Sequence, residues 1–254
     1  MTKPYLSIIL PSIRPFLLER AYKAVEKSCE DMPFELIVIS PFSLPVELNM
    51  VHNVKFIQDF GQPSRCANMG LTLAEGRMVT LLSDDCITHP GIYKTIDAQY
   101  LSMGHEGFIG LKYNEGVSMN DPNYWMAKSH PPLQLDGLRD DMPVSSMIYI
   151  KTHTLRHMGG WDSINFECIN WGGHDLTARL LNASYKYELS KDSFCQVEWG
   201  PGIDGMYNDH RPLWESDEDG RNKMRELWGT PNIRTRIDEF NWTKAPSVWK
   251  RRFK

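Results

Sequence analysis

The sequence lacks the glycine motifs of the commonest nucleotide enzymes and hydrolases at the places where such motifs act. No G-x-G-x-x-G follows the first apolar run, and neither G-x-x-x-x-G-K-[ST] nor G-x-S-x-G occurs anywhere. Those motifs bind a dinucleotide pyrophosphate, cradle nucleotide phosphates and expose a nucleophilic serine, respectively. The chain is therefore a poor candidate for a Rossmann dehydrogenase, a Walker-type kinase or an α/β-hydrolase.

Cysteine is scarce, and long apolar runs are absent. The five cysteines are odd in number and form no C-x-x-C pair. This pattern disfavours a disulfide framework and a zinc knuckle, and it indicates a reducing compartment. No run approaches the ~20 apolar residues of a membrane helix, and the apolar run at 6–10 is too short for a signal peptide. We expect a soluble protein of the cytoplasm.

Neither sign of charge is in large excess. The net charge of −4 over 254 residues gives no indication of a nucleic-acid partner or of an acidic membrane surface. The basic cluster at 250–254 either is a solvated tail or binds a phosphate-rich partner or a membrane surface. The length allows one large domain or two small ones, with an ordinary globular composition.

Strand-like and helix-like patterns alternate through the first hundred residues. Short β-rich runs occupy 6–10, 34–39, 54–57 and 78–82, and helical patterns occupy 16–29, 64–75 and 90–101. Nearly continuous apolar strands that alternate with helices predict a parallel sheet covered on both faces. In such sheets, ligands bind at the carboxyl ends of the strands.

The second half of the chain is less regular. Residues 104–143 are rich in Gly, Asn, Asp and Pro and show little periodicity. We expect strands at 145–150, 186–189 and 195–199, and helices at 175–181 and 221–228.

Two adjacent carboxylates, Asp84 and Asp85, end the fourth apolar run. Neighbouring anions repel, and burial of either one is costly unless a cation pairs with it. One interpretation is a solvated turn in which an aspartate caps backbone groups. The other is that one carboxylate holds Mg²⁺ or Mn²⁺ while its neighbour accepts hydrogen bonds from a sugar hydroxyl.

Several short motifs follow one another along the chain. They are SIILPS at 7–12, RCANMGL at 65–71, AEG at 74–76, SDD at 83–85, GGWD at 159–162 and WGGHDL at 171–176. Together they resemble the family 2 glycosyltransferases of the GT-A fold, over residues 5–190. The resemblance implies an α/β, Rossmann-like, mostly parallel sheet with helices on both faces. It also implies a nucleotide-sugar-binding half at 1–103, an acceptor-binding and catalytic half at 104–200, and a C-terminal extension at 201–254 that closes the site.

The resemblance implies a nucleoside-diphosphate sugar as donor and a divalent metal, Mn²⁺ or Mg²⁺, as cofactor. In that family an S/T/D-x-D element holds both, so Asp85 is expected to bind the metal and Asp84 to orient the ribose or the donor sugar. Further contacts to the donor are expected from Pro11, Ser12, Arg14, Arg65 and Asn68.

The chain departs from the family after its second strand. An aspartate there usually reads the nucleobase, whereas this sequence has Ser40 and Pro41. We expect Ser40 or backbone groups to read the base, unless the donor is not a uridine nucleotide. An arginine that commonly precedes the Asn-x-Gly element is Ala67 here, although Arg65 is near enough in sequence to reach a phosphate.

The acceptor side depends on the segment around Asp175. The family has a Glu-Asp pair whose aspartate is the catalytic base, and this aspartate corresponds to Asp175, preceded by His174. Asp175 could instead cap the helix at 176–181, and both roles can coexist. His174 is expected to be structural or to contact the acceptor. Trp161 and Trp171 either form a platform for the acceptor sugar or pack in the core.

His210 is the remaining candidate, because several GT-A enzymes place a C-terminal histidine on the metal or the diphosphate. The alternative is a surface histidine. We therefore expect a metal-dependent, inverting glycosyltransferase in which Asp175 takes the proton of an acceptor hydroxyl. The acceptor would be a glycan, a protein or another hydroxyl-bearing molecule.

Two other functions are compatible with the same scaffold. A sugar-phosphate nucleotidyltransferase would need a glycine-rich phosphate loop after the first strand, where PSIRP at 11–15 has no glycine. A non-catalytic nucleotide-sugar-binding module would be favoured by loss of Asp85 or Asp175, and both are present.

Overall fold

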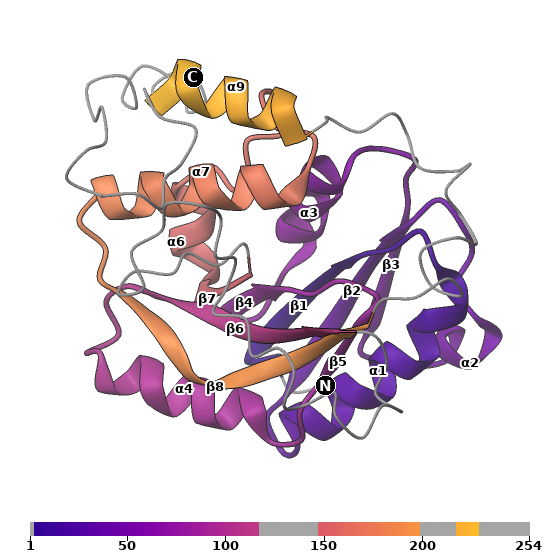
Figure 1. Ribbon diagram of the computed structural model, residues 1–254. Helices are drawn as coiled ribbons and strands as arrows, with labels where there is room; N and C mark the ends of the chain where they lie inside the picture. Colours follow the sequence, from indigo (N-terminus) through magenta and orange to yellow (C-terminus); the bar gives the residue numbers. More distant parts are fainter. Residues whose placement is uncertain (1–2, 117–146, 199–216, 229–254) are drawn as a thin grey trace.

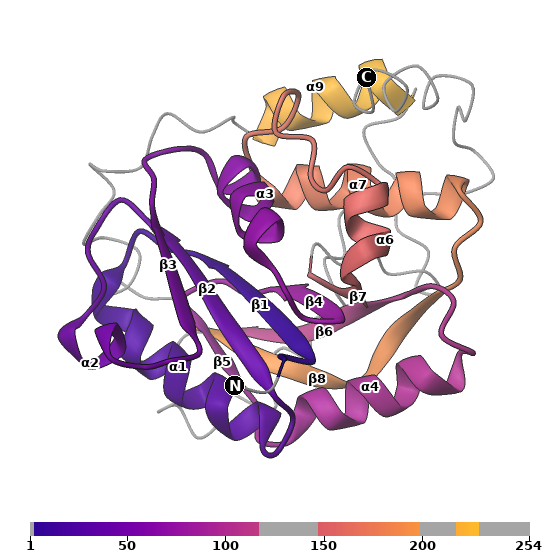
Figure 2. The same ribbon diagram turned by 180° about the vertical axis from the view of Figure 1, so that it is seen from behind.

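Eight strands form one sheet in the computed structural model of the chain, which describes residues 3–116, 147–198 and 217–228. The strand order is β3-β2-β1-β4-β7-β6-β8-β5. Helices cover both faces of this sheet, as the two opposite views in Figures 1 and 2 show. The predicted α/β architecture with a mostly parallel sheet is confirmed. None of the helices in the described ranges is both long and apolar enough to span a membrane.

The first part of the chain forms the parallel side of the sheet. The pairs β1–β2, β2–β3 and β1–β4 are all parallel, as the strand–helix alternation predicts. The elements are β1 (Leu6–Pro11), α1 (Pro15–Cys29), β2 (Phe34–Ser40), α2 (Val46–Asn49), β3 (Val54–Gln58), α3 (Pro63–Leu73) and β4 (Met78–Leu81). Since parallel strands run in one direction, the carboxyl ends of these four strands meet at one edge.

The second part adds antiparallel pairs. Strand β7 lies between β4 and β6 and is antiparallel to both, β5 is antiparallel to β8, and β6 is parallel to β8. The elements are β5 (Cys86–Thr88), α4 (Ile92–Ser102), β6 (Phe108–Gly116), β7 (Ile148–Lys151), α6 (Thr152–His157), α7 (Ile169–Asn182), β8 (Tyr187–Glu198) and α9 (Asp217–Trp228).

Side-chain alternation along β1 divides the core into two layers. Leu6, Ile8 and Leu10 pack with buried residues of α1 and α4, whereas Ile9 packs with buried residues of α3, α6 and α7. All four β1 side chains are fully buried. This is the pattern of a central strand with helices on both faces, and it fixes where the end of β1 emerges.

Two predicted boundaries are wrong. Helix α7 begins at Ile169, six residues before the predicted start at Asp175, so Asp175 lies inside the helix and does not cap it. Strand β8 is a single 12-residue strand where two were expected. It continues through its polar centre because β6 pairs with it there, and Ser190 Oγ accepts a hydrogen bond from Lys112 N at 2.9 Å.

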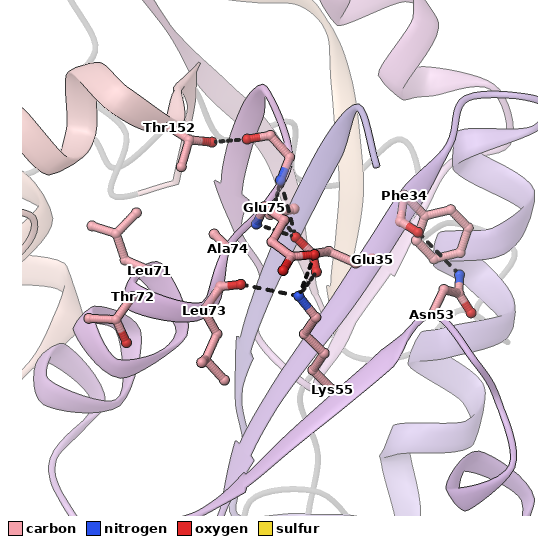
Figure 3. A network of polar contacts seen from close by, with 12 residues as sticks. Phe34, Glu35, Asn53, Lys55, Leu71, Thr72, Leu73, Ala74, Glu75 and Thr152 are labelled. Carbon is pink, nitrogen blue, oxygen red and sulfur yellow. Dashed lines mark hydrogen bonds and ion pairs between the residues drawn. The ribbon is translucent and has the colours of Figure 1, made fainter. Parts of the chain in front are cut away.

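A buried carboxylate joins three strands at the amino end of the sheet, opposite the edge formed by the carboxyl ends of the parallel strands. Glu35 Oε1 accepts hydrogen bonds from Ser7 Oγ and from the backbone N–H groups of Glu75 and Gly76, at 2.6, 2.6 and 3.2 Å. Its Oε2 lies 2.7 Å from Lys55 Nζ, which also pairs with Glu75 (Figure 3). Burial would raise the pKa of Glu35, but Lys55, Ser7 and the Glu75 N–H outweigh burial and hold the pKa below its ordinary value of 4.5.

We expect Glu35→Gln to lower the free energy of unfolding by about 2 kcal/mol at neutral pH, because it breaks a buried ion pair. Urea unfolding measures this loss. The pKa of Glu35 is lowered by folding, so the carboxylate stabilises the protein above its unfolded pKa, and this stability is lost as pH falls through the folded pKa. The difference between variant and wild type should therefore vanish in acid.

Glu75→Gln is the matched control, since it removes the other carboxylate on the same Lys55. The Glu75 side chain is 65% exposed, so its loss should cost under ~0.5 kcal/mol. Equal losses for the two variants, or a Glu35→Gln effect that persists in acid, would contradict this interpretation.

Candidate functional site

A cavity of about 330 Å³ lies at the carboxyl ends of the parallel strands. Its walls come from the loop after β1, the ends of β2 and β3, the turn after β4 and the first residues of α7. This is the edge at which the strand pattern predicts a ligand. The predicted residues that line it are Pro11, Ser12, Arg14, Asp84 and Asp85.

Asp84 is engaged entirely by the protein. It is 2% exposed, and its two oxygens accept four hydrogen bonds. Oδ2 accepts from Ser12 Oγ at 2.7 Å and from Arg14 N at 3.2 Å, and Oδ1 accepts from Arg14 Nε at 2.9 Å and from Arg14 Nη2. A carboxylate offers about four acceptor positions, so all of those on Asp84 are filled.

Asp85 retains acceptor capacity. Its Oδ2 lies 2.8 Å from Arg14 Nη2, and the contact of its Oδ1 in the described structure is the Cys86 thiol at 3.9 Å. Mg²⁺ at phosphate sites commonly uses one or two carboxylates together with substrate phosphates. Asp85 fits that donor set and Asp84 does not. The described ranges hold no cluster of three or more His, Cys, Asp and Glu side chains suited to a metal, so the metal site stays a prediction that rests on Asp85.

Arg14 is a buried cation in the cavity wall, between β1 and α1. Burial would lower its pKa, but Asp84 and Asp85 outweigh burial and raise the pKa further above its ordinary value. The guanidinium therefore stays charged at any physiological pH. Its Nε and Nη2 donate to the two aspartates, whereas Nη1 is buried and has no hydrogen-bond partner among the described residues.

The end of the cavity at β2 and β3 differs from the prediction. Ser40 is fully buried, does not line the cavity, and accepts a hydrogen bond from Phe42 N at 3.1 Å through its hydroxyl. Pro41 and Asp59 line the cavity there. Sequence reasoning missed Asp59, although it is the first carboxylate after the third strand and the strand-end rule points to it.

Arg65 reaches that same carboxylate. Its Nη2 lies 2.8 Å from Asp59 Oδ2, while Asp59 Oδ1 accepts a hydrogen bond from Gly61 N at 2.8 Å. Arg65 itself does not line the cavity, and its side chain is more than half exposed. Its predicted phosphate contact stays a prediction.

The Cys66 thiol in the cavity wall is a poor nucleophile. Cys66, Cys86 and Cys168 line the cavity. Burial raises the pKa of the Cys66 thiol to about 12, and Asp59 acts in the same direction. Because the thiolate is the reactive form, this cysteine is unreactive at neutral pH.

Asn68 holds a turn and does not line the cavity. Its amide accepts a hydrogen bond from Trp161 N at 2.9 Å and donates one to Trp161 O at 2.7 Å. Gly160 precedes Trp161 with φ of +65°, and a Cβ there would lie 2.2 Å from Asn68 Oδ1. The turn therefore requires both the glycine conformation and the amide, which gives Asn68 a structural role beside its predicted contact to the donor.

Asp175 lies inside α7, away from the cavity lining. It is 1% exposed, and its Oδ2 accepts a hydrogen bond from Arg179 Nε at 2.9 Å. Arg179 also donates to Met158 O and to Gly160 O, the latter at 2.6 Å. The pair thus supports the same turn that Asn68 holds. The base role of Asp175 stays a prediction, because the carboxylate is buried and does not line the cavity.

The other acceptor-side candidates are also buried. Trp161 belongs to the core between the sheet and α7. Trp171 packs edge-on against His174, with ring centroids 5.4 Å apart, and a Cβ on Gly220 of α9 would meet its indole at 2.2 Å. Of the two interpretations of these tryptophans, the geometry favours packing. His210 lies outside the described residues.

Comparisons with known proteins support the fold. No family model matches the sequence, and no curated protein matches it. Among solved structures, the first 349 residues of S. aureus TarS in complex with UDP align with a TM-score of 0.56 and 16% identity, over 87% of this chain and 63% of that one. The UDP-GlcNAc complex of the same fragment aligns with a TM-score of 0.57 and 16% identity, over 87% of this chain and 64% of that one. TarS is a glycosyltransferase of the GT-A fold, so the predicted fold type is confirmed. This chain spans less than two thirds of either fragment.

We expect Asn68→Ala to lower the free energy of unfolding by about 2 kcal/mol, because it leaves the Trp161 backbone N–H without its acceptor and removes one of the two hydrogen bonds to the Trp161 C=O, the other coming from Ser163 N. Urea unfolding is the measurement. The control is Ser163→Ala, which removes only a 3.4 Å contact to the same amide and should change stability by less than ~0.5 kcal/mol.

The same pair of variants separates the two roles of Asn68. If Asn68→Ala keeps full stability and loses nucleotide binding, the predicted donor contact is its main function and the structural role is secondary.

Proposed function

We propose that the chain is a glycosyltransferase that moves a sugar from a nucleoside-diphosphate sugar to an acceptor hydroxyl. One observation carries the proposal: Asp85 and the charged Arg14 lie side by side in a cavity at the carboxyl ends of the parallel strands. Sites at this edge bind nucleotides in many α/β folds, and the cavity has the size of a small-molecule site. TarS, which shares the fold, has been solved with UDP and with UDP-GlcNAc. A uridine-diphosphate sugar is therefore the donor we propose first.

The groups around the leaving diphosphate follow from charge. The bond from the anomeric carbon to the diphosphate breaks, and negative charge grows on the departing oxygen. Arg14 supplies a fixed positive charge beside that position. Asp85 would hold Mn²⁺ or Mg²⁺ together with the donor phosphates, and such an ion would act there as a Lewis acid. His210 is proposed as a further ligand.

The nucleobase end of the donor is assigned to Asp59 and Pro41. The Ser40 hydroxyl is buried and bound to Phe42 N, so it is badly placed to read a base. The Asp59 carboxylate lines the cavity at the end of the neighbouring strand. It would accept a hydrogen bond from an N–H of the base, which is the role that an aspartate after the second strand usually has in the family that the sequence resembles.

The acceptor side is proposed from the resemblance. Asp175 would take the proton of the acceptor hydroxyl, and a single displacement would invert the anomeric carbon. Access to Asp175 requires the acceptor to displace part of its packing against Arg179. A nucleotidyltransferase is the alternative, and it is distinguished by its product, a sugar nucleotide formed from a nucleoside triphosphate.

The donor assignment is tested by thermal unfolding with a panel of nucleoside diphosphates, with and without Mn²⁺. At a ligand concentration 100 times its dissociation constant, binding adds about 2.7 kcal/mol, which raises the Tm of a chain of this size by roughly 5–10 °C. We expect UDP with Mn²⁺ to give such a shift. Asp85→Ala should abolish the Tm shift. Asp59→Ala should reduce the Tm shift given by UDP and make the shifts given by nucleoside diphosphates with different bases more alike. A panel in which no nucleoside diphosphate shifts the Tm contradicts the proposal.

The role of Asp175 as the catalytic base is tested with Asp175→Asn. We expect release of diphosphate from the sugar nucleotide to fall at least about 100-fold, the loss typical of a missing general base, while the Tm shift by UDP is retained. Arg179→Lys serves as the control for the ion pair. If Asp175→Asn and Arg179→Lys lower stability and activity in parallel, Asp175 acts through the fold and is not the base.

A further inference from the structure

The hydrogen bonds of Arg14 are distributed unevenly over its five N–H groups. Nε donates to Asp84, and Nη2 donates to both Asp84 and Asp85. Nη1 carries two N–H groups, is buried, and has no acceptor among the described residues. Arg14 is 6% exposed and lines the cavity. An unpaired buried donor on a charged group is costly, and such groups in native proteins usually have a specific partner.

Asp84 fixes the guanidinium in place. It accepts hydrogen bonds from the backbone N of Arg14 and from its side chain, so both ends of the residue are bound to one carboxylate. Ser12 supports the arrangement, since its hydroxyl donates to Asp84 and accepts from Arg14 N at 3.1 Å. With its acceptor positions filled, Asp84 has none left for a ribose or sugar hydroxyl.

The charges also indicate that Asp84 serves Arg14 and that Asp85 serves a cation. Arg14 and Asp84 neutralise one another, so Asp85 is the formal charge that remains between the loop after β1 and the turn after β4. A divalent cation on Asp85 would leave this part of the site at a net charge of +1, which suits a diphosphate. Without Arg14, the negative charge of Asp84 would cancel that excess.

We infer that Arg14 binds a diphosphate oxygen of the donor through Nη1, and that Asp84 is a positioning residue for Arg14 and touches neither the ribose nor the sugar. This inference rests on the proposed function and changes the role of one of its residues. Ligand oxygens satisfy the unpaired Nη1, and the rigid hold on the guanidinium lowers the cost of ordering it.

Calorimetric titration with UDP and with uridine, at fixed Mn²⁺, tests the inference. Arg14→Lys and Asp84→Asn should each lower the affinity for UDP about tenfold and change that for uridine less than about threefold, because only UDP carries the diphosphate. The double variant should lose about tenfold in total, not a hundredfold, since the two residues act as one unit. Asp59→Asn is the matched control, and it should weaken UDP and uridine alike.

Three results would overturn the inference: unchanged UDP affinity in both single variants, equal losses for UDP and uridine, or losses that multiply in the double variant. Thermal unfolding without ligand establishes that each variant is folded. If Asp84→Asn does not fold, Arg14→Lys alone decides, by the ratio of its UDP loss to its uridine loss. Failure of the proposed function is distinct, because then the wild type binds none of the nucleoside diphosphates.

Discussion

The ion pair between Arg14 and Asp84 is the contact on which the candidate site depends. It joins the loop after β1 to the turn after β4, two segments seventy residues apart in sequence. A buried charge without its partner is strongly destabilising, so neither residue can be there alone. This explains why an apolar strand delivers two carboxylates to its own end: Arg14, which follows the neighbouring strand, contributes to filling both oxygens of Asp84, whereas it contacts one oxygen of Asp85 and leaves the other available for chemistry.

The different roles of Asp84 and Asp85 determine the charge at this edge of the sheet. Two free aspartates would make the edge of the sheet repel a diphosphate, whereas one aspartate beside a neutral pair leaves a place for a single cation. The guanidinium is also pre-positioned, because its backbone and its side chain bind the same carboxylate. The sequence places Asp84 and Asp85 at a strand end, yet it does not reveal which of them has all its acceptor positions filled with the help of Arg14, since that depends on how two loops meet in space.

The predictable part of the fold is the part with strong local periodicity. Strands β1 to β4 and helices α1 and α3 follow from apolar runs and helical spacing, and the edge that carries the cavity follows from their parallel order. The start of α7 could not be predicted in this way, because the two glycines near its start suggest a turn. In the structure a Cβ on Gly172 would lie 2.9 Å from Ser64 Oγ, so that glycine allows α3 and α7 to approach closely. Strands β5 and β6 are likewise held by pairing with strands distant in sequence, and they were not predicted from the sequence.

The acceptor side illustrates what a motif can and cannot transfer. Asn68, Trp161 and Asp175 all belong to motifs that point to a glycosyltransferase site, yet each is bound or packed around one turn that ends at Trp161. Asn68 binds its backbone, and Arg179, paired with Asp175, binds the carbonyl oxygen of Gly160. These residues fix the position of α7. The residue before this helix, Cys168, and its first two residues, Ile169 and Asn170, line the cavity. A motif therefore identifies the scaffold and the chemistry together, and only burial and hydrogen bonding separate the residues that meet a ligand from those that hold the wall in place.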